Sequence, residues 1–232
     1  MSDPKKYFTA ARKKFIDSPL KEPGFKKYKT AFIGRLTEDG VFQFLNFEKS
    51  AHGGEQFAVD VAIRPMYCRN ESYLTLLPGN RLGAMATDGG SDKWWNYSTQ
   101  EKALASFTEI AALLHEYALP FFDATTTSRG IIEAHEKKTF GDKVRWGTSG
   151  WGDYDLAHVY LRAGEEEKAL AHFDAAHEKF SLDEREWAQC AARECLAMKP
   201  LIAAGRACID RYVAGRIEES KTKLKLGDWQ GY

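Results

Sequence analysis

Three histidines and three consecutive glutamates lie within DLAHVYLRAGEEEKALAHFDAAHEKF, residues 155–180, and could form a metal or acid/base site. His172 and His177 are five residues apart, so on a helix their side chains point about 140° away from each other. His158 belongs to the preceding helical segment. The glutamates at 165–167 fan around the start of a helix, where the helix dipole already favours negative charge. We therefore predict a packing hairpin here, with no bound metal.

Other catalytic motifs begin in this sequence but are not completed. The two His-Glu pairs, at 115–116 and 135–136, lack the second histidine of a zinc protease helix, and Ser149 lacks the GxSxG spacing of a nucleophile elbow. The glycine-rich segments match neither a Walker motif nor a GxGxxG loop. The sequence thus predicts no catalytic residue, no metal and no cofactor, and it favours a binding protein over an enzyme.

An enzyme whose active-site residues are dispersed along the chain stays the first alternative, because such residues can converge in the folded protein. Its first candidates are charged residues of the expected strands, Arg35, Asp60 and Arg64. The four cysteines form no CxxC pair, and three of them lie among alanines in helical sequence. We expect reduced, buried thiols.

The composition is that of a folded protein with no overall charge. The 232 residues are 44% hydrophobic, and 33 basic residues balance 33 acidic ones, so no chain-wide field attracts nucleic acid or a membrane. No apolar run reaches the length of a membrane span, and the N-terminal segment carries charges where a secretion signal needs an apolar core. We therefore expect a cytoplasmic protein that recognises its partner locally.

The first thirty residues are strongly basic. Their cations are Lys5, Lys6, Arg12, Lys13, Lys14, Lys21, Lys26, Lys27 and Lys29. Such a cluster can bind phosphates, so a nucleic-acid-associated protein is the second alternative. Apolar residues between Tyr7 and Ile16 recur at helical spacing, however, which places many of these lysines on the solvated side of an amphipathic helix. We favour that interpretation.

A β-rich region follows. The runs 28–36, 40–50 and 55–65 predict three antiparallel strands, with a tight turn at Asp39-Gly40. Further β-like sequence covers RLGAM at 81–85 and the segment 88–98.

Helical patterns fill the rest of the chain. Ser98 or Thr99 predicts the start of a long helix that Pro120 ends or kinks, and a shorter helix is expected over 127–137. The glycine-rich segment 140–153 predicts the boundary between an α+β domain, residues 1–140, and a helical extension, residues 151–226. In that extension we expect breaks at Gly164, near Ser181, at Pro200 and around Gly227.

The extension resembles a tetratricopeptide hairpin. The spacings of that motif are matched by Leu156, Ala157, Tyr160, Ala169, Phe173 and Ala176. One repeat length later the pattern is degraded, although Trp187 stands at the tryptophan position. Because solenoids need about three repeats for independent stability, we expect the hairpins to lean on the N-terminal unit or on a partner.

Aromatic residues provide the candidate contact surfaces. Trp151, Tyr154 and His158 recur at helical spacing on the face that tetratricopeptide repeats commonly turn to ligands. Trp94 and Trp95 form a second cluster in a predicted loop. The alternative is that these rings seal the protein's own interior, which we favour for Trp146 and Trp151 as a seal between the two halves.

Residues 5–135 resemble the bacterial domain family DUF4304. The resemblance rests on Gly24-Phe25-Lys26, Phe32 and Arg35, Asn46 with Ser50, and Phe57 with Val59 and Ile63. It implies an antiparallel sheet with flanking helices, but it carries no activity or site residues.

The resulting expectation is a non-catalytic α+β protein with a helical extension that binds a protein partner. Small, neutral, motif-poor bacterial proteins of this kind are similar in character to immunity proteins, so the specific hypothesis for the partner is a toxin of bacterial competition. Whether the extension packs on the sheet, and in which oligomeric state the protein exists, stay open.

Overall fold

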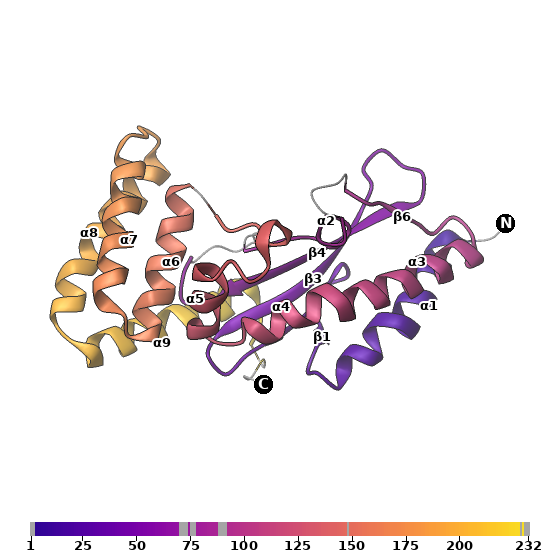
Figure 1. Ribbon diagram of the computed structural model, residues 1–232, viewed down its shortest axis with the longest axis horizontal. Helices are drawn as coiled ribbons and strands as arrows, with labels where there is room; N and C mark the ends of the chain where they lie inside the picture. Colours follow the sequence, from indigo (N-terminus) through magenta and orange to yellow (C-terminus); the bar gives the residue numbers. More distant parts are fainter. Residues whose placement is uncertain are drawn as a thin grey trace.

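The structure is a computed structural model that describes residues 3–69, 74, 78–87, 92–147, 149–227 and 229. A central sheet has helices on one face and is flanked at one end by an upright group of helices (Figure 1). The strands are β1 (Lys26–Lys27), β2 (Phe32–Leu36), β3 (Val41–Lys49), β4 (Gln56–Pro65), β5 (Gly79–Arg81) and β6 (Trp95–Asn96). The first helical segments are α1 (Pro4–Arg12), the π-helical η1 (Lys13–Asp17) and the short η2 (Pro19–Lys21).

The sheet is antiparallel throughout, in the order β1-β2-β3-β4-β5, with β6 also pairing with β4. The three predicted strands are confirmed as β2, β3 and β4. The Asp39-Gly40 turn joins β2 to β3, and Gly40 adopts a φ of 82°, which glycine tolerates without strain. The turn also ties distant helices together, because the Asp39 carboxylate accepts hydrogen bonds from Arg162 Nε (2.9 Å) and from the Ser128 backbone N–H (2.5 Å).

One face of the sheet is covered by α1 and by the helix α3 (Gln100–Leu113). Their contact with the sheet is aromatic: Phe8 packs edge-on against Phe57 and Phe107, at centroid distances of 4.9 and 5.2 Å, and Phe57 stacks on Phe107. Alternation along β3 and β4 sends Val41, Leu45 and Phe47, and Phe57, Val59, Val61 and Ile63, into this layer. The predicted first helix is therefore amphipathic, with its apolar side buried.

The long helix begins as predicted, since Thr99 Oγ1 accepts a hydrogen bond from the Lys102 backbone N–H (3.2 Å). It does not end at Pro120, however. A π-helical turn, η3 (Leu114–Ala118), comes before the proline, and the helix continues as α4 (Leu119–Ala124). The wider π turn accommodates a residue that has no N–H to donate. The helix predicted over 127–137 is confirmed as α5 (Ser128–Glu136), which the 3-10 turn η4 (Gly141–Lys143) follows.

The predicted β-like run RLGAM is only partly extended. Arg81 ends β5, and the next four residues form the short helix α2 (Leu82–Met85), whose Leu82 and Met85 are buried in the main core. Tertiary packing thus overrides a weak local pattern. Of the segment 88–98, residues 95–96 form β6, while 88–91 lie outside the described residues.

Four helices follow: α6 (Gly150–Ala163), α7 (Glu166–Ser181), α8 (Glu186–Ala203) and α9 (Arg206–Leu224). The predicted turn at Gly164 is confirmed, with a φ of 84°. The tetratricopeptide positions Ala157, Tyr160, Ala169, Phe173 and Ala176 are buried, as a packing hairpin requires. The predicted break at Pro200 is wrong. α8 continues to Ala203 because Met198 and Ile202 pack into the core and hold its last turn.

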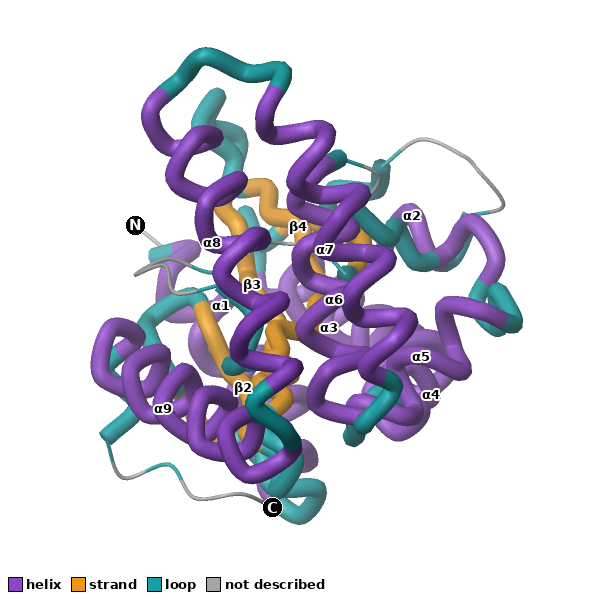
Figure 2. Tube along the Cα trace, turned by 90° about the vertical axis from the view of Figure 1, so that its left-hand side faces the viewer, coloured by secondary structure: helices purple, strands orange, loops and turns teal. Residues whose placement is uncertain are grey.

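α9 leaves the helical group and returns to the second face of the sheet, as Figure 2 shows beside β2. There Leu224 and Leu226 join Phe42, Phe44 and Ala62 in a separate buried cluster. Tyr28 OH donates to the Leu224 carbonyl at 2.6 Å, across 196 positions of sequence. The extension therefore packs on the sheet and does not swing free, and the main buried cluster runs from Phe8 to Val213. Within the described residues, no helix is long and apolar enough to cross a membrane.

This second-face cluster can be tested by Leu226→Ala. Removing a fully buried leucine side chain is expected to lower the free energy of unfolding by about 2–5 kcal/mol. The matched control is Leu182→Ala, because Leu182 is 83% exposed and its loss should change stability by less than about 0.5 kcal/mol. Urea unfolding measures both values. Equal stabilities of the two variants would contradict the packing of the C-terminal segment on the sheet.

Candidate functional site

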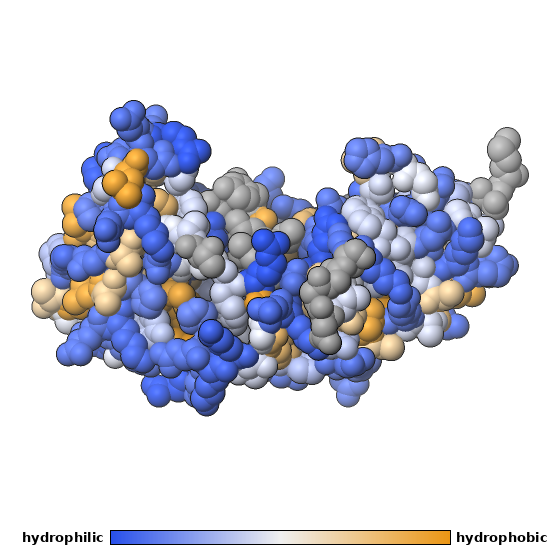
Figure 3. All heavy atoms as spheres, turned by 45° about the horizontal axis from the view of Figure 1, so that its top comes forward, coloured by the Kyte–Doolittle hydropathy of each residue, from blue (hydrophilic) through white to orange (hydrophobic). Residues whose placement is uncertain are grey.

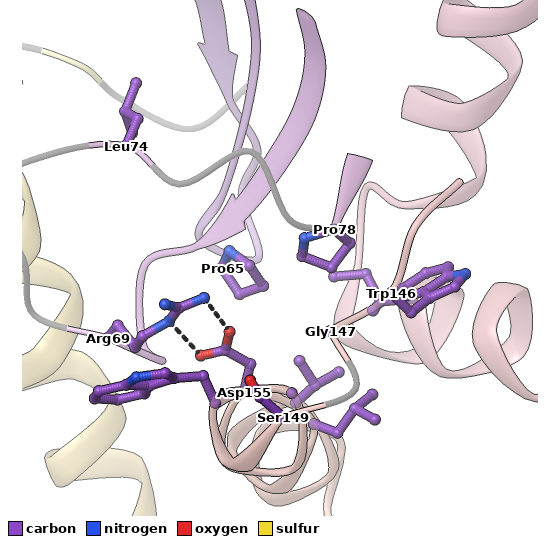
Figure 4. A pocket seen from close by; sticks show the side chains of 13 residues that line it. Pro65, Arg69, Leu74, Pro78, Trp146, Gly147, Ser149 and Asp155 are labelled. Carbon is purple, nitrogen blue, oxygen red and sulfur yellow. Dashed lines mark hydrogen bonds and ion pairs between the residues drawn. The ribbon is translucent and has the colours of Figure 1, made fainter. Parts of the chain in front are cut away.

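A cavity of about 480 Å³ lies where the helical extension meets the end of β4 (Figure 4), and we call it the junction cavity. Its walls are mostly apolar and come from Pro65, Pro78, Ile131, Trp146, Leu156 and Val159, among others. Arg69 and Asp155 form a bidentate ion pair at its side, with Nε to Oδ1 at 3.0 Å and Nη2 to Oδ2 at 2.7 Å. The cavity is thus apolar with one neutralised ion pair in its wall.

A stack of aromatic and guanidinium groups leads from this cavity to the end of the helical hairpins. The Arg69 guanidinium lies 5.2 Å from the Trp151 ring, Trp151 stacks on Trp187 at 5.9 Å and 17°, and the Arg185 guanidinium lies 4.7 Å from Trp187. The Phe180 ring packs edge-on against both indoles, with its centroid 4.9 Å from that of Trp151 and 6.2 Å from that of Trp187. We call Arg69, Trp151, Trp187 and Arg185 the tryptophan stack.

The stack ends at an exposed apolar surface. Trp187 is 43% exposed, and Leu182 in the turn between α7 and α8 is 83% exposed. Figure 3 shows apolar residues reaching the surface at this end of the molecule. Both arginines of the stack are paired with carboxylates, Arg69 with Asp155 and Arg185 with Asp183. Glu184 and Glu186 lie exposed on either side of Arg185, so flat rings and a leucine are presented beside a net negative charge.

The other two residues of the predicted contact face are not exposed. Tyr154 and His158 are fully buried because α9 lies against this side of α6. His158 Nε2 is 3.0 Å from Tyr212 OH, its Nδ1 is 2.9 Å from the Tyr154 carbonyl, and Tyr154 OH accepts a hydrogen bond from Arg216 Nη2. The prediction of an open ligand face is corrected on this point, since the protein's own helix occupies it. Of the three residues, Trp151 alone is partly exposed.

Trp94 and Trp95 separate in the structure. Trp94 is 36% exposed and lies 5.0 Å from the Arg81 guanidinium, whereas Trp95 is buried and its Nε1–H donates to Glu109 Oε2 at 3.2 Å. Trp95 thus seals the protein's own core. Trp146 is half-buried between α5 and the junction cavity, 5.1 Å from the His135 ring, in agreement with its interpretation as a seal between the two halves.

The candidates of the enzyme alternative do not converge. Arg35 lies on the helix-covered face of the sheet, where its Nε donates to Gln43 and its Nη2 pairs with Asp123. Asp60 and Arg64 lie on the other face, four residues apart on β4, which separates them by about 13 Å. Burial raises the pKa of Asp60 to about 6, an effect that the Asn46 hydrogen bond and Arg81 reduce.

A polar cleft of about 950 Å³ adjoins the junction cavity and contains His135, Glu136, Ser149 and Tyr160. Tyr160 OH and Lys168 Nζ both donate to Glu136 Oε1, at 2.8 and 2.9 Å, so this oxygen of the carboxylate is already engaged. Burial, with the nearby His172, lowers the pKa of His135, whose Nδ1 has no hydrogen-bond partner among the described residues. No base-to-nucleophile hydrogen bond is formed by His135 within that part of the chain.

The potential metal ligands and the cysteine thiols can also be located in the structure. Among the described residues, no three His, Cys, Asp or Glu side chains are grouped to hold a metal ion. All four cysteines are free; Cys68 and Cys195 are buried as expected, whereas Cys190 is exposed. Arg193 Nη2 lies 3.0 Å from the Cys190 sulfur.

Sequence reasoning missed most of the tryptophan stack. Trp187 was identified only as a repeat position, and Arg69, Asp155, Leu182 and Arg185 were not identified at all. The spacing between Trp151 and Trp187, 36 residues, is close to one repeat length, and this periodicity is the signal that could have paired the two rings.

The fold and site define an α+β sheet domain whose helical extension ends in an exposed aromatic surface. Residues 16–124 match the family model described as Domain of unknown function (DUF4304), so the chain contains a DUF4304 domain. The match begins in η1 and ends at the last residue of α4, which confirms the resemblance over the sheet and its helical cover. No curated protein and no solved structure matches the chain.

Burial of His158 generates a prediction about pH. Burial and the charge of Arg216 lower its pKa from 6.5 to about 3, so the folded state holds a neutral ring that the unfolded state protonates. The contribution of His158 to stability is therefore complete above pH 6.5 and is lost as the pH falls toward 3. Relative to His158→Gln, the wild type should lose about 3 kcal/mol of unfolding free energy between about pH 7 and about pH 4.5. Parallel pH profiles of the two proteins would contradict the buried neutral ring.

Proposed function

We propose that this protein binds a protein partner through the tryptophan stack. The observation that carries the proposal is the exposed Trp187 ring, stacked on Trp151 and flanked by two guanidinium groups beside an apolar cavity. Tryptophan and arginine dominate the energetically important positions of protein interfaces, because they bury a large area at a small cost in conformational entropy. Stacking and Phe180 already hold both rings in place, which reduces that cost further.

The charge pattern favours an apolar segment as the ligand. Because Asp155 and Asp183 neutralise the two arginines, and Glu184 and Glu186 add negative charge, an acidic segment would gain little here. An aromatic or aliphatic side chain of a partner could cover Trp187 and Leu182, and a second could enter the junction cavity, which is of a size typical for binding pockets. The partner is therefore expected to present two or more apolar side chains.

As the specific form of this proposal, we propose that the partner is a toxin of bacterial competition, which this protein neutralises as an immunity protein. The support is the similarity in character to small, neutral immunity proteins, together with a surface suited to protein contact. Nothing in this role requires a reaction.

The contact surface is tested by Trp187→Ala, with Leu196→Ala as the matched control. Both residues lie on α8 and are similarly exposed, 43% and 45%, but nine positions place them on opposite sides of the helix. With a purified partner, Trp187→Ala should weaken binding by about 2 kcal/mol or more, close to thirtyfold in Kd, and Leu196→Ala should leave it unchanged. Calorimetric titration measures the affinities, and thermal unfolding checks that both variants fold. Unchanged affinity of a folded Trp187→Ala variant would refute the proposed surface.

The immunity role is tested in cells. The toxin candidate is the product of a gene adjacent to the one that encodes this chain, and co-expression of the wild-type protein should restore growth of cells that produce the toxin. Trp187→Ala should protect less than Leu196→Ala. If the wild type gives no protection, the immunity role is wrong, while binding to another protein partner would still be tested by the calorimetry.

The polar cleft around His135 is the observation that favours the enzyme alternative. It has weaker support, because Tyr160 and Lys168 already donate to Glu136, and the described residues show no hydrogen bond between His135 and a nucleophile.

A further inference from the structure

A basic groove lies beside the α1–η1 helix, at the edge of the sheet that β1 forms. It consists of two cavities, of about 620 and 520 Å³, between the α1–η1 helix and the strands β1 to β3. Lys13, Asp17 and Lys27 line both cavities, so the two adjoin each other. We call them together the basic groove.

Arg12 forms the buried part of this groove. Its side chain is about nineteen parts in twenty buried, at 5% exposure, and its guanidinium lies 4.4 Å from the Phe47 ring. Nε donates to Asp17 Oδ1 at 3.0 Å and Nη1 to the Thr30 carbonyl at 2.7 Å. Nη2 is buried without a hydrogen-bond partner among the described residues. A permanently charged group with an unused donor is thus held at the wall of a cavity.

Three lysines line the same cavity as this guanidinium. Lys13, Lys27 and Lys49 line the larger cavity, and within the described part of the chain none of them forms an ion pair with a carboxylate. Of the two carboxylates of the same cavity, Asp17 pairs with Arg12 within the groove and Glu48 pairs with Arg81 outside it. The groove therefore carries an excess of positive charge that the protein itself does not balance.

The pKa of Lys49 responds to this excess of positive charge. Its ammonium lies 4.6 Å from the Phe8 ring and 5.2 Å from the Tyr97 ring, so its position is fixed by contact with aromatic faces. Burial, together with the positive charges of Lys5 and Arg12, lowers the pKa of Lys49. An anion bound beside it would relieve this repulsion.

We propose that the basic groove binds phosphate groups. A guanidinium and several ammonium groups around a partly apolar cavity are the donors that phosphate recognition uses, and the elongated shape suits a ligand with more than one phosphate. The phosphates could belong to a small phosphorylated molecule or to a nucleic-acid backbone, since both present the same chemistry. The site is independent of the tryptophan stack. It uses only part of the basic N-terminal segment, because Lys14 and Lys29 lie instead over the rings of Phe15 and Tyr28.

The test uses the full chain and two probes, inorganic pyrophosphate in calorimetry and a fluorescent single-stranded oligonucleotide in anisotropy at low salt. The variant is Lys13→Gln with Lys27→Gln, because both side chains are exposed and their loss should not unfold the protein. The matched control is Lys137→Gln with Lys138→Gln, exposed lysines at the end of α5 with the same change in charge.

Binding of either probe should be weakened at least about tenfold in the groove variant and much less in the control. If pyrophosphate binds and the oligonucleotide does not, the ligand is a small phosphorylated molecule. If only the oligonucleotide binds, the logarithmic salt dependence of its affinity should fall by about two in the groove variant, which identifies a nucleic-acid backbone. Failure of both probes to bind, or equal weakening in the two variants, would overturn the proposal.

Discussion

The structure depends on the burial of β3 and β4 on both faces. One face carries Val59 and Ile63 into the aromatic layer under α1 and α3, while the other presents Phe42 and Phe44. An antiparallel sheet can leave one face in water, but a face with these rings cannot. The helical extension therefore completes the core of the sheet, since Leu224 at the end of α9 and Leu226 just after it close this second face.

This constraint explains why the tetratricopeptide-like hairpin lacks an open ligand face. A helix that must reach the sheet passes along α6, and Tyr212 and Arg216 fill the place that a bound peptide would take. The same route anchors the extension at its start, through Arg69 with Asp155 and through Asp39 with Arg162. What remains accessible is the end of the hairpins, where Trp187 and Leu182 are exposed.

Local chemistry determined the parts that sequence could predict. Alternation and the Asp39-Gly40 turn are enough for β2 to β4, and Thr99 and Gly164 mark helix ends through their own conformational preferences. The errors arise where distant packing decides, as at Pro200 inside α8, or at His158 beneath a helix that follows it by about fifty residues. The tryptophan stack and the basic groove combine residues from several elements, and no local pattern reveals such combinations.

The hydrogen bond between Tyr28 and the Leu224 carbonyl also sets the order in which the chain can be completed. The strands leave the ribosome early, but their second face waits for residues 224–226, which are made about 10–30 s later at ordinary rates of synthesis. During that interval Phe42 and Phe44 lie open on a growing chain. The second face of the sheet therefore closes only after the helical extension has been made.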